Sequence, residues 1–161
     1  MSPRKAVTLA AAVAALVLGQ AATASASAAP ATSTASSAPR VQHMLDTYLA
    51  QHPEAHRTGT DTLSIPGGTL TVAPQGTKSG TRAISCADKH LCIQDGRGYR
   101  YDYYRCGTYS FNGIGDGVFN NNQTPGTVAR FYNSDRTLRW TNRAKSTGTA
   151  SWTPVFYVQP C

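Results

Sequence analysis

The first hydrophobic pattern of the chain is an uncharged apolar run over residues 6–19, which follows the basic residues Arg4 and Lys5. Small residues come after it and form two overlapping Ala-x-Ala cleavage motifs. A short basic start, an apolar segment too short for a stable membrane anchor and a small-residue exit are typical of a secretory signal peptide. The pattern therefore predicts a signal peptide over residues 1–28. It also predicts a secreted, extracellular protein with no membrane association after cleavage.

Further along, apolar residues recur with the spacing of one helical face. They are Val41, Met44, Leu45, Tyr48 and Leu49. This recurrence at i, i+3, i+4, i+7 and i+8 predicts a short amphipathic helix, which Pro53 ends. The preceding residues 29–40 are mostly Ala, Ser, Thr and Pro with nothing to bury, so we expect a disordered spacer there.

Two short β-branched runs then flank Pro66-Gly67-Gly68, and this pattern predicts a β-hairpin. A polar stretch follows, which we interpret as a linker. Residues 41–85 thus form an N-terminal extension of short helix, β-hairpin and linker. A propeptide, a separate module and an extra cover on the following domain are all compatible with this extension. The length and polarity of the linker favour an extension with local structure of its own.

From residue 86 onward the pattern changes to short strands separated by turn residues, without helical periodicity. Thirteen of the 14 aromatic residues lie in residues 86–161, so this segment holds the main core. Short, frequent, β-branched and aromatic runs predict a compact all-β domain, either a sandwich or a barrel. At 76 residues such a core is small and needs additional covalent stabilisation.

All four cysteines lie in this β segment, at Cys86, Cys92, Cys106 and Cys161. An even number of cysteines in an exported chain predicts two disulfides. Three pairings are possible. We prefer Cys86 with Cys92, which closes a small loop, and Cys106 with Cys161, which ties the last residue to the middle of the chain. The spacing lacks the paired C-x2-C motifs of a zinc site.

Charge and aromatic residues suggest a candidate binding surface. Without the signal peptide, 13 basic residues remain against 8 acidic ones, a net charge of +5 that favours acidic partners. In one alternating strand, Tyr99, Tyr101 and Tyr103 share a face. On the other face we expect Arg100 to pair with Asp102. The tyrosines are a candidate surface for stacking a cell-wall polysaccharide, and we expect no nucleic-acid partner for a secreted protein.

Histidines and carboxylates do not assemble a recognisable catalytic or metal-binding motif. His52 and His56 flank a glutamate, but Pro53 disfavours helix at this point, so we expect a solvated helix exit in place of a zinc site. His90 could be combined on paper with Asp88 and a serine, yet no G-x-S-x-G elbow is present. The β domain also has no glutamate for a facing carboxylate pair. We therefore predict no enzyme, no catalytic residue and no cofactor.

Two segments of the β domain resemble a known family. They are CADKHLC at residues 86–92, followed by a tyrosine-rich strand and a third cysteine, and GVFNNNQTPGTVARFY at residues 117–132. This pattern is similar to the small secreted actinobacterial proteins of peptidase inhibitor family I36. The N-terminal YLAQHPEAHRTG and GGTLTV are similar to an extension that some members carry, so the resemblance covers residues 41–161.

The resemblance implies both a fold and a function. The fold is a small disulfide-braced, βγ-crystallin-like sandwich of two Greek-key motifs with four strands each, here with the N-terminal helix and hairpin extension. The function is non-enzymatic inhibition of secreted proteases, with metalloproteases as the best-known targets. A rigid disulfide-held loop would fill the protease cleft, and its rigidity would lower the ordering cost of binding. No motif assigns a reactive bond to a numbered position of this chain.

The asparagine-rich stretch after residue 119 is the second candidate site. βγ-crystallin motifs often bind calcium through a loop of the form N/D-N/D-x-x-S/T-S. Asn120, Asn121 and Thr124 match it, but Pro125 stands at the last position and no carboxylate lies in the loop. We expect a degenerate calcium-type loop that holds no metal. Its asparagines would cap backbone groups and its Pro-Gly pair would form a turn.

Besides calcium binding through the asparagine-rich loop, the sequence leads to three hypotheses of function. The first is a secreted binding protein that inhibits a protease. The alternative is a cell-envelope or carbohydrate-binding β module, based on the tyrosine face and the positive charge. The third is a secreted hydrolase that uses His90 or an aspartate such as Asp102.

Overall fold

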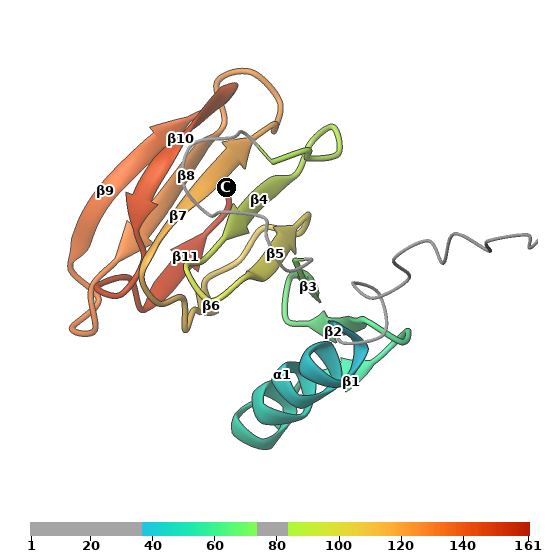
Figure 1. The fold of residues 1–161 in the computed structure, drawn as a ribbon. Helices are drawn as coiled ribbons and strands as arrows, with labels where there is room; N and C mark the ends of the chain where they lie inside the picture. The colour runs from blue at the N-terminus through green and yellow to red at the C-terminus, as the bar shows by residue number, and fades with distance from the viewer. Residues whose placement is uncertain (1–36, 74–83) are drawn as a thin grey trace, which may run out of the picture. The chain divides into compact units, whose positions relative to one another are not determined.

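The structure is a computed structural model that describes residues 37–73 and 84–161 (Figure 1). These residues form one helix and eleven strands. In chain order the elements are α1 (Ser37–Gln51), β1 (His56–Arg57), β2 (Thr62–Ile65), β3 (Gly68–Val72), β4 (Leu91–Gln94), β5 (Tyr99–Tyr103), β6 (Tyr109–Ser110), β7 (Asp116–Asn121), β8 (Val128–Tyr132), β9 (Leu138–Arg143), β10 (Ser146–Ser151) and β11 (Tyr157–Gln159). The predicted signal peptide, most of the predicted spacer and most of the linker lie outside the described residues.

The strands form two antiparallel sheets and no barrel, which confirms the predicted all-β sandwich with an N-terminal helix. Sheet A has the strand order β1-β2-β3-β5-β4-β7-β10, and sheet B has the order β6-β11-β8-β9. Strands β4 to β7 and strands β8 to β11 are two successive units of four. In each unit the third strand belongs to the sheet of the other unit. β10 pairs with β7 in sheet A, and β6 pairs with β11 in sheet B. Two interlocked Greek-key units of this kind agree with the fold that the resemblance implies.

Aromatic side chains form the centre of the core. Trp152, which follows β10, is fully buried. Its ring centroid lies 5.6 Å from that of Phe111, 5.8 Å from that of Phe131 and 6.2 Å from that of Trp140. Phe131 and Trp140 stack on each other at 3.9 Å. The core predicted from the aromatic content of the second half of the chain is therefore present, since a few large rings bury much apolar area.

Both preferred disulfides are present. Cys86 bonds to Cys92 and Cys106 bonds to Cys161, with Cα atoms 5.7 and 5.2 Å apart. The first bond closes the loop that leads into β4. The second ties the last residue of the chain to the segment between β5 and β6. Two disulfides indicate that the protein forms in an oxidising compartment.

The helix and hairpin are built into the β domain. α1 begins at Ser37, so the last four residues of the predicted spacer are helical. The predicted hairpin is formed by β2 and β3, and Pro66 is followed in its turn by Gly67 with φ +83°, as a tight turn of this type requires. β3 also pairs with β5 over its whole length. We expected an extension with local structure of its own, whereas the hairpin instead continues sheet A and covers an otherwise unpaired strand edge.

Tyr99, Tyr101 and Tyr103 share one face of β5, as predicted, but this face lies in the core. Their exposed fractions are 5%, 0% and 1%. The Tyr48 ring of α1 lies 5.7 Å from the Tyr99 ring, and the Phe111 ring lies 4.8 Å from the Tyr101 ring. The predicted binding surface at these tyrosines is therefore wrong. Strand alternation shows which side chains share a face, but it does not show which segment covers that face.

On the opposite face of β5, other contacts replace the expected pair of Arg100 with Asp102. Asp102 Oδ1 lies 2.5 Å from His90 Nδ1. The Arg100 guanidinium donates instead to the backbone carbonyl of Ser85. Cys92 is the register partner of Asp102, and His90 lies two residues before it. The neighbouring strand therefore brings an imidazole to the aspartate, which periodicity within one strand does not reveal.

Burial of the tyrosines makes stability sensitive to alkaline pH. Desolvation raises the pKa of Tyr101 and Tyr103 well above the usual value, and it also raises the pKa of Tyr48 and Tyr99. A phenol whose pKa rises on folding stabilises the fold fully below its unfolded pKa of about 10 and loses that contribution as the pH rises further. Each fully buried tyrosine should lower the free energy of unfolding by about 1.4 kcal/mol for every pH unit above about pH 10.

The variant Tyr101→Phe isolates one of these contributions. The Tyr101 hydroxyl is buried and has no hydrogen-bond partner among the described residues. Its removal should therefore change the free energy of unfolding by no more than about 1 kcal/mol at about pH 8. Urea unfolding at about pH 8 and about pH 10.8 should show a smaller alkaline loss for the variant than for the unaltered chain. Equal losses in the two proteins would contradict this assignment.

Candidate functional site

A buried carboxylate organises the turn between β4 and β5. Asp95 follows β4 directly and is fully buried. Its Oδ1 accepts hydrogen bonds from the backbone N–H groups of Arg97, Gly98 and Tyr99, at 3.0, 3.0 and 2.9 Å. Aspartate is favoured in such turns because its short side chain reaches the N–H groups just ahead of it. A single side chain therefore holds the turn over residues 95–98.

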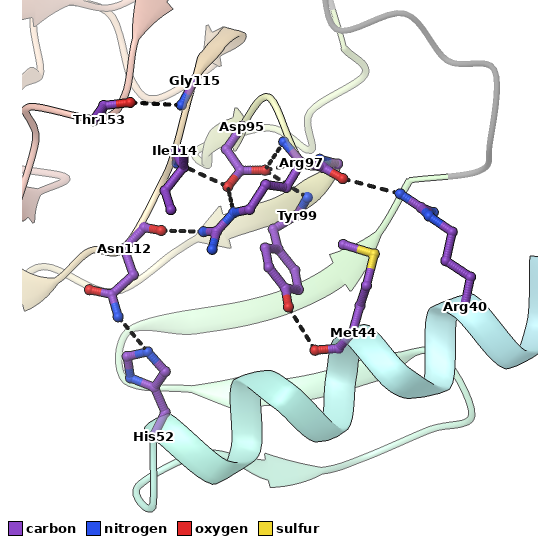
Figure 2. A network of polar contacts seen from close by, with 11 residues as sticks. Arg40, Met44, His52, Asp95, Arg97, Tyr99, Asn112, Ile114, Gly115 and Thr153 are labelled. Atoms are coloured by element: carbon purple, nitrogen blue, oxygen red, sulfur yellow. Dashed lines mark hydrogen bonds and ion pairs between the residues drawn. The ribbon is translucent and has the colours of Figure 1, made fainter.

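The second carboxylate oxygen joins this turn to the loop between β6 and β7 (Figure 2). Asp95 Oδ2 accepts from Arg97 Nε at 2.9 Å and from the backbone N–H of Ile114 at 3.2 Å. The Arg97 guanidinium also donates to the backbone carbonyl of Asn112. In addition, the N–H of Gly96 donates to the carbonyl of Ile114 at 2.8 Å. The buried charge is thus paired and accepts several directed hydrogen bonds, which makes it a strong local brace.

The same loop is held from its other side by the segment after β10. The N–H of Gly115 donates to Thr153 Oγ1 at 2.9 Å (Figure 2). The N–H of Trp152 donates to the Gly115 carbonyl at 2.9 Å. Gly115 has φ +75°, and a Cβ at Gly113 would lie 2.4 Å from the aromatic ring two residues before it. Both positions therefore require glycine. We call residues 111–115 the braced loop.

The braced loop presents an exposed aliphatic side chain beside a small groove. Ile114 is 49% exposed, and Phe156, between β10 and β11, is 46% exposed. Both side chains line a groove of about 270 Å³. Its other walls come from the rest of the braced loop, from Arg97 and from Gln51 at the end of α1. Exposed large apolar side chains with a polar rim are typical of a surface that binds a protein.

A buried histidine ties the end of α1 to the braced loop. His52 is 7% exposed, and its ring stacks on that of Tyr48 with centroids 4.1 Å apart. Asn112 Nδ2 lies 2.8 Å from His52 Nε2 (Figure 2). Glu54 Oε1 lies 3.1 Å from His52 Nδ1. The pKa of Glu54 is lowered, chiefly by a hydrogen bond that its carboxylate accepts from its own backbone N–H and then by His52. The expected solvated helix exit is therefore wrong at His52, because tertiary contacts bury the ring after the helix has ended.

The asparagine-rich stretch lies at the end of β7 and caps backbone carbonyls. Asn120 Nδ2 donates to the carbonyl of Ile84 at 2.8 Å, and Asn122 Nδ2 donates to that of Cys86 at 3.0 Å. Asn121 Nδ2 donates to the Asn142 carbonyl at 3.1 Å. The expectation that these amides cap backbone groups is confirmed. Within the described ranges, His, Cys, Asp and Glu form no group of three or more that could hold a metal ion.

The turn that ends this stretch also forms as expected. The N–H of Thr127 donates to the carbonyl of Thr124 at 3.0 Å, and Pro125 and Gly126 occupy the two central positions. Gly126 has φ +91°, as glycine allows at the second central position of such a turn. Thr124 thus serves the turn through its backbone, and it lies outside β7, which ends at Asn121.

The candidate catalytic residues do not come together as a triad. Asp88 lies 3.0 Å from Lys145 and not against His90. His90 pairs with Asp102, and its ring lies 5.2 Å from that of Tyr104. In the part of the chain that the structure describes, no hydroxyl or thiol is hydrogen-bonded to the His90 ring. The pair links the first disulfide loop, which contains His90, to β5.

Sequence reasoning missed the braced loop and its groove. They combine segments that are distant in the chain, at residues 95–98, 111–115 and 152–156, and the groove also includes Gln51 at the end of α1. Two local signals were visible. Asp-Gly-Arg-Gly after a strand is a turn with a capping aspartate, and the glycines around Ile114 indicate close backbone packing. Neither signal shows that the two turns meet.

Comparison with protein-family models, characterised proteins and solved structures finds no match to this chain. The single helix in the described part of the chain is not long and apolar enough to cross a membrane.

Proposed function

We propose that this protein is a secreted, non-enzymatic binding protein that inhibits a protease by inserting the braced loop into the protease cleft. The observation that carries the proposal is the exposed Ile114, held in a loop whose backbone is fixed from both sides. Hydrogen bonds to Asp95 and Thr153 flank it. An inhibitor gains affinity when its binding segment is ordered before association, because less conformational entropy is lost on binding.

The surroundings of Ile114 support a protein partner over a small ligand. Ile114 and Phe156 are among the few large apolar side chains exposed in the described residues. They lie on the same groove, so a partner could bury both at once. Binding surfaces typically gain most of their free energy from a few such anchors surrounded by polar residues. The resemblance to family I36 suggests a metalloprotease as the target class.

An inhibition assay with matched variants tests this function. The chain from residue 29 onward should be titrated against a thermolysin-like metalloprotease and a subtilisin-like serine protease. We expect inhibition of the metalloprotease, and we expect Ile114→Ala to raise the inhibition constant by about tenfold or more. Because Ile114 is largely exposed, the variant should lose no more than about 0.5 kcal/mol of stability.

Leu138→Ala is the control for that variant. Leu138 is 54% exposed on β9, away from the groove. The control should inhibit as the unaltered chain does, within about twofold, because it removes an exposed aliphatic side chain that does not line the groove. Absence of inhibition of both proteases at micromolar excess would contradict the inhibitor function. Equal weakening by the two variants would contradict only the assignment to the braced loop.

A further inference from the structure

The outer face of sheet B carries several arginines on neighbouring strands. Arg130 on β8 lies opposite Thr141 on β9 and opposite Gln159 on β11. Val128 lies opposite Arg143. Residues directly opposite in an antiparallel pair share a face, so the side chains of Arg130 and Arg143 lie on the same side of the sheet. Arg139 is the extra residue of the β-bulge that interrupts this pairing next to Trp140, and its side chain is exposed.

The other side of the sheet faces the core, which establishes that this face points outward. Ala129, Phe131 and Val158 alternate with the residues just named and are fully buried. The arginines are exposed or half-buried. A fourth arginine, Arg136 in the turn between β8 and β9, lies over the Tyr157 ring at 4.6 Å from its centroid. We call the surface formed by Arg130, Arg136, Arg139 and Arg143 the arginine face.

The charge of the arginine face is not neutralised by neighbouring carboxylates. From residue 117 to the last residue the chain has five basic residues and one acidic residue, Asp135. Asp135 accepts hydrogen bonds from the hydroxyl and N–H of Thr137, at 2.6 and 2.9 Å. Hydrogen bonds to Thr137 lower the pKa of Asp135. Among the described residues, none of the four arginines forms an ion pair.

Their actual partners leave most of each guanidinium available. Arg143 donates to the Gly126 carbonyl at 3.3 Å, and Arg139 donates to Asn133 Oδ1 at 3.2 Å. Arg130 makes a weak contact of 3.4 Å with a backbone carbonyl of its own strand. A guanidinium has five N–H donors, so each of these side chains retains donors for an anionic partner.

Two tyrosines and a small cavity complete the surface. Tyr132 and Tyr157 lie opposite each other on β8 and β11, and the Tyr132 hydroxyl donates to Gln159 Oε1 at 2.7 Å. A cavity of about 220 Å³ is lined by Thr108, Tyr132, Arg136 and Tyr157. It is smaller than the usual site for a drug-sized ligand. Its aromatic rings, hydroxyls and single guanidinium suit one sugar unit that carries an acidic group.

We propose that the arginine face binds a carboxylate-bearing polysaccharide, with repeated uronate units along the sheet and one unit in the Tyr132 cavity. Arg143 lies opposite Val128, two residues from Arg130 along β8, so Arg130 and Arg143 are diagonal neighbours about 7–8 Å apart. Arg139 lies four residues before Arg143 on β9, at most about 13 Å away. A row of charges at this spacing matches a repeated anion better than a single compact one. Each guanidinium can bind a planar carboxylate through two parallel hydrogen bonds.

The same surface is a poorer match to nucleic acid. Single-strand binding uses aromatic rings that are free to stack on bases, whereas the Tyr157 ring is already covered by Arg136. Duplex DNA is read by an element that enters a groove, and this face is an outward sheet surface without a protruding helix or ribbon. The oxidising compartment indicated by the two disulfides also favours a cell-surface or extracellular glycan.

Binding to alginate, a polyuronate, tests the proposal, with neutral dextran and duplex DNA as comparison ligands. The chain from residue 29 onward should bind alginate at about 50 mM salt and bind more weakly at about 500 mM salt, because salt screens exposed charges. The variant Arg130→Gln with Arg143→Gln should weaken alginate binding by about tenfold or more. Lys89→Gln with Arg105→Gln has the same net charge and should weaken it by no more than about twofold.

Two single variants complete the test. Arg136→Gln removes only the turn arginine that lines the cavity, so it reports on the face even if the double variant folds poorly. Ile114→Ala should leave alginate binding unchanged, which separates this surface from the proposed inhibitor site. The proposal is overturned if alginate does not bind at low salt, if both charge-matched double variants weaken binding equally, or if duplex DNA binds more tightly than alginate.

Discussion

Replacement of Cys106 and Cys161 by alanine is expected to lower the free energy of unfolding by about 4.2 kcal/mol. The bond between them spans 55 residues, and closing a loop of that length removes much conformational entropy from the unfolded chain. It also anchors the last residue, two positions after the end of β11. β11 has only 3 residues, yet it pairs with both β6 and β8 in the middle of sheet B. Loss of the bond should therefore allow the end of sheet B to fray.

The matched comparison is the pair of alanines at Cys86 and Cys92. Their bond spans 6 residues, so the same entropy argument gives a loss of about 2.4 kcal/mol. Urea unfolding of both double variants at neutral pH measures the two losses directly. A larger loss from the short bridge than from the long one would show that packing around buried Cys92 outweighs chain entropy. That order would contradict the prediction.

Local patterns in the sequence were sufficient for the elements themselves. The apolar stripe around Leu45 predicted the helix, the Pro-Gly-Gly turn predicted the hairpin, and aromatic content located the core. Each of these features depends on residues close together in the chain. The preferred pairing of Cys106 with Cys161, which ties the last residue to the middle of the chain, is also present. The number of cysteines and the oxidising compartment predicted that two disulfides form.

Features that depend on distant segments could not be read in this way. Tyr99, Tyr101 and Tyr103 alternate as a surface stripe would, but α1 and the loop carrying Phe111 cover them. The polar linker suggested a separate extension. In the structure, β3 pairs with β2 along one edge and with β5 along the other. Both errors have one physical cause. In each case the segment that covers an apolar face or pairs with a strand edge lies far away in the chain, and local periodicity does not identify that segment.

The two proposed surfaces differ in how much of each the sequence contains. The excess of arginine after residue 117 is visible without a structure. Its placement on one outer face requires the register of β8 with β9 and β11. The braced loop is less visible still, because Asp95, which supports it from a neighbouring turn, looks like an ordinary turn aspartate in the sequence. Asp95 supports Ile114 only because the turn after β4 and the loop between β6 and β7 lie side by side.

Asp95→Asn should therefore have a selective effect. The amide keeps one carbonyl oxygen, which can still accept from the N–H groups of Arg97, Gly98 and Tyr99. Its NH2 group replaces the oxygen that accepts from Arg97 Nε and from Ile114 N–H. Donors then face donors, and the buried charge that paired with the guanidinium is gone. We expect a loss of about 3 kcal/mol in the free energy of unfolding, since breaking one side of a buried ion pair leaves polar groups unsatisfied.

Amide hydrogen exchange separates this loss from general destabilisation. The N–H of Ile114 should exchange much faster in Asp95→Asn, whereas the N–H of Tyr99 should stay protected by the remaining carbonyl oxygen. Asp116→Asn, at an exposed aspartate of β7, is the control and should change stability by no more than about 0.5 kcal/mol. Uniform acceleration of both amides would mean that Asp95 supports the whole sheet and not the braced loop in particular. Selective release of Ile114 should also weaken protease inhibition, because the exposed side chain would remain while the order that presents it is lost.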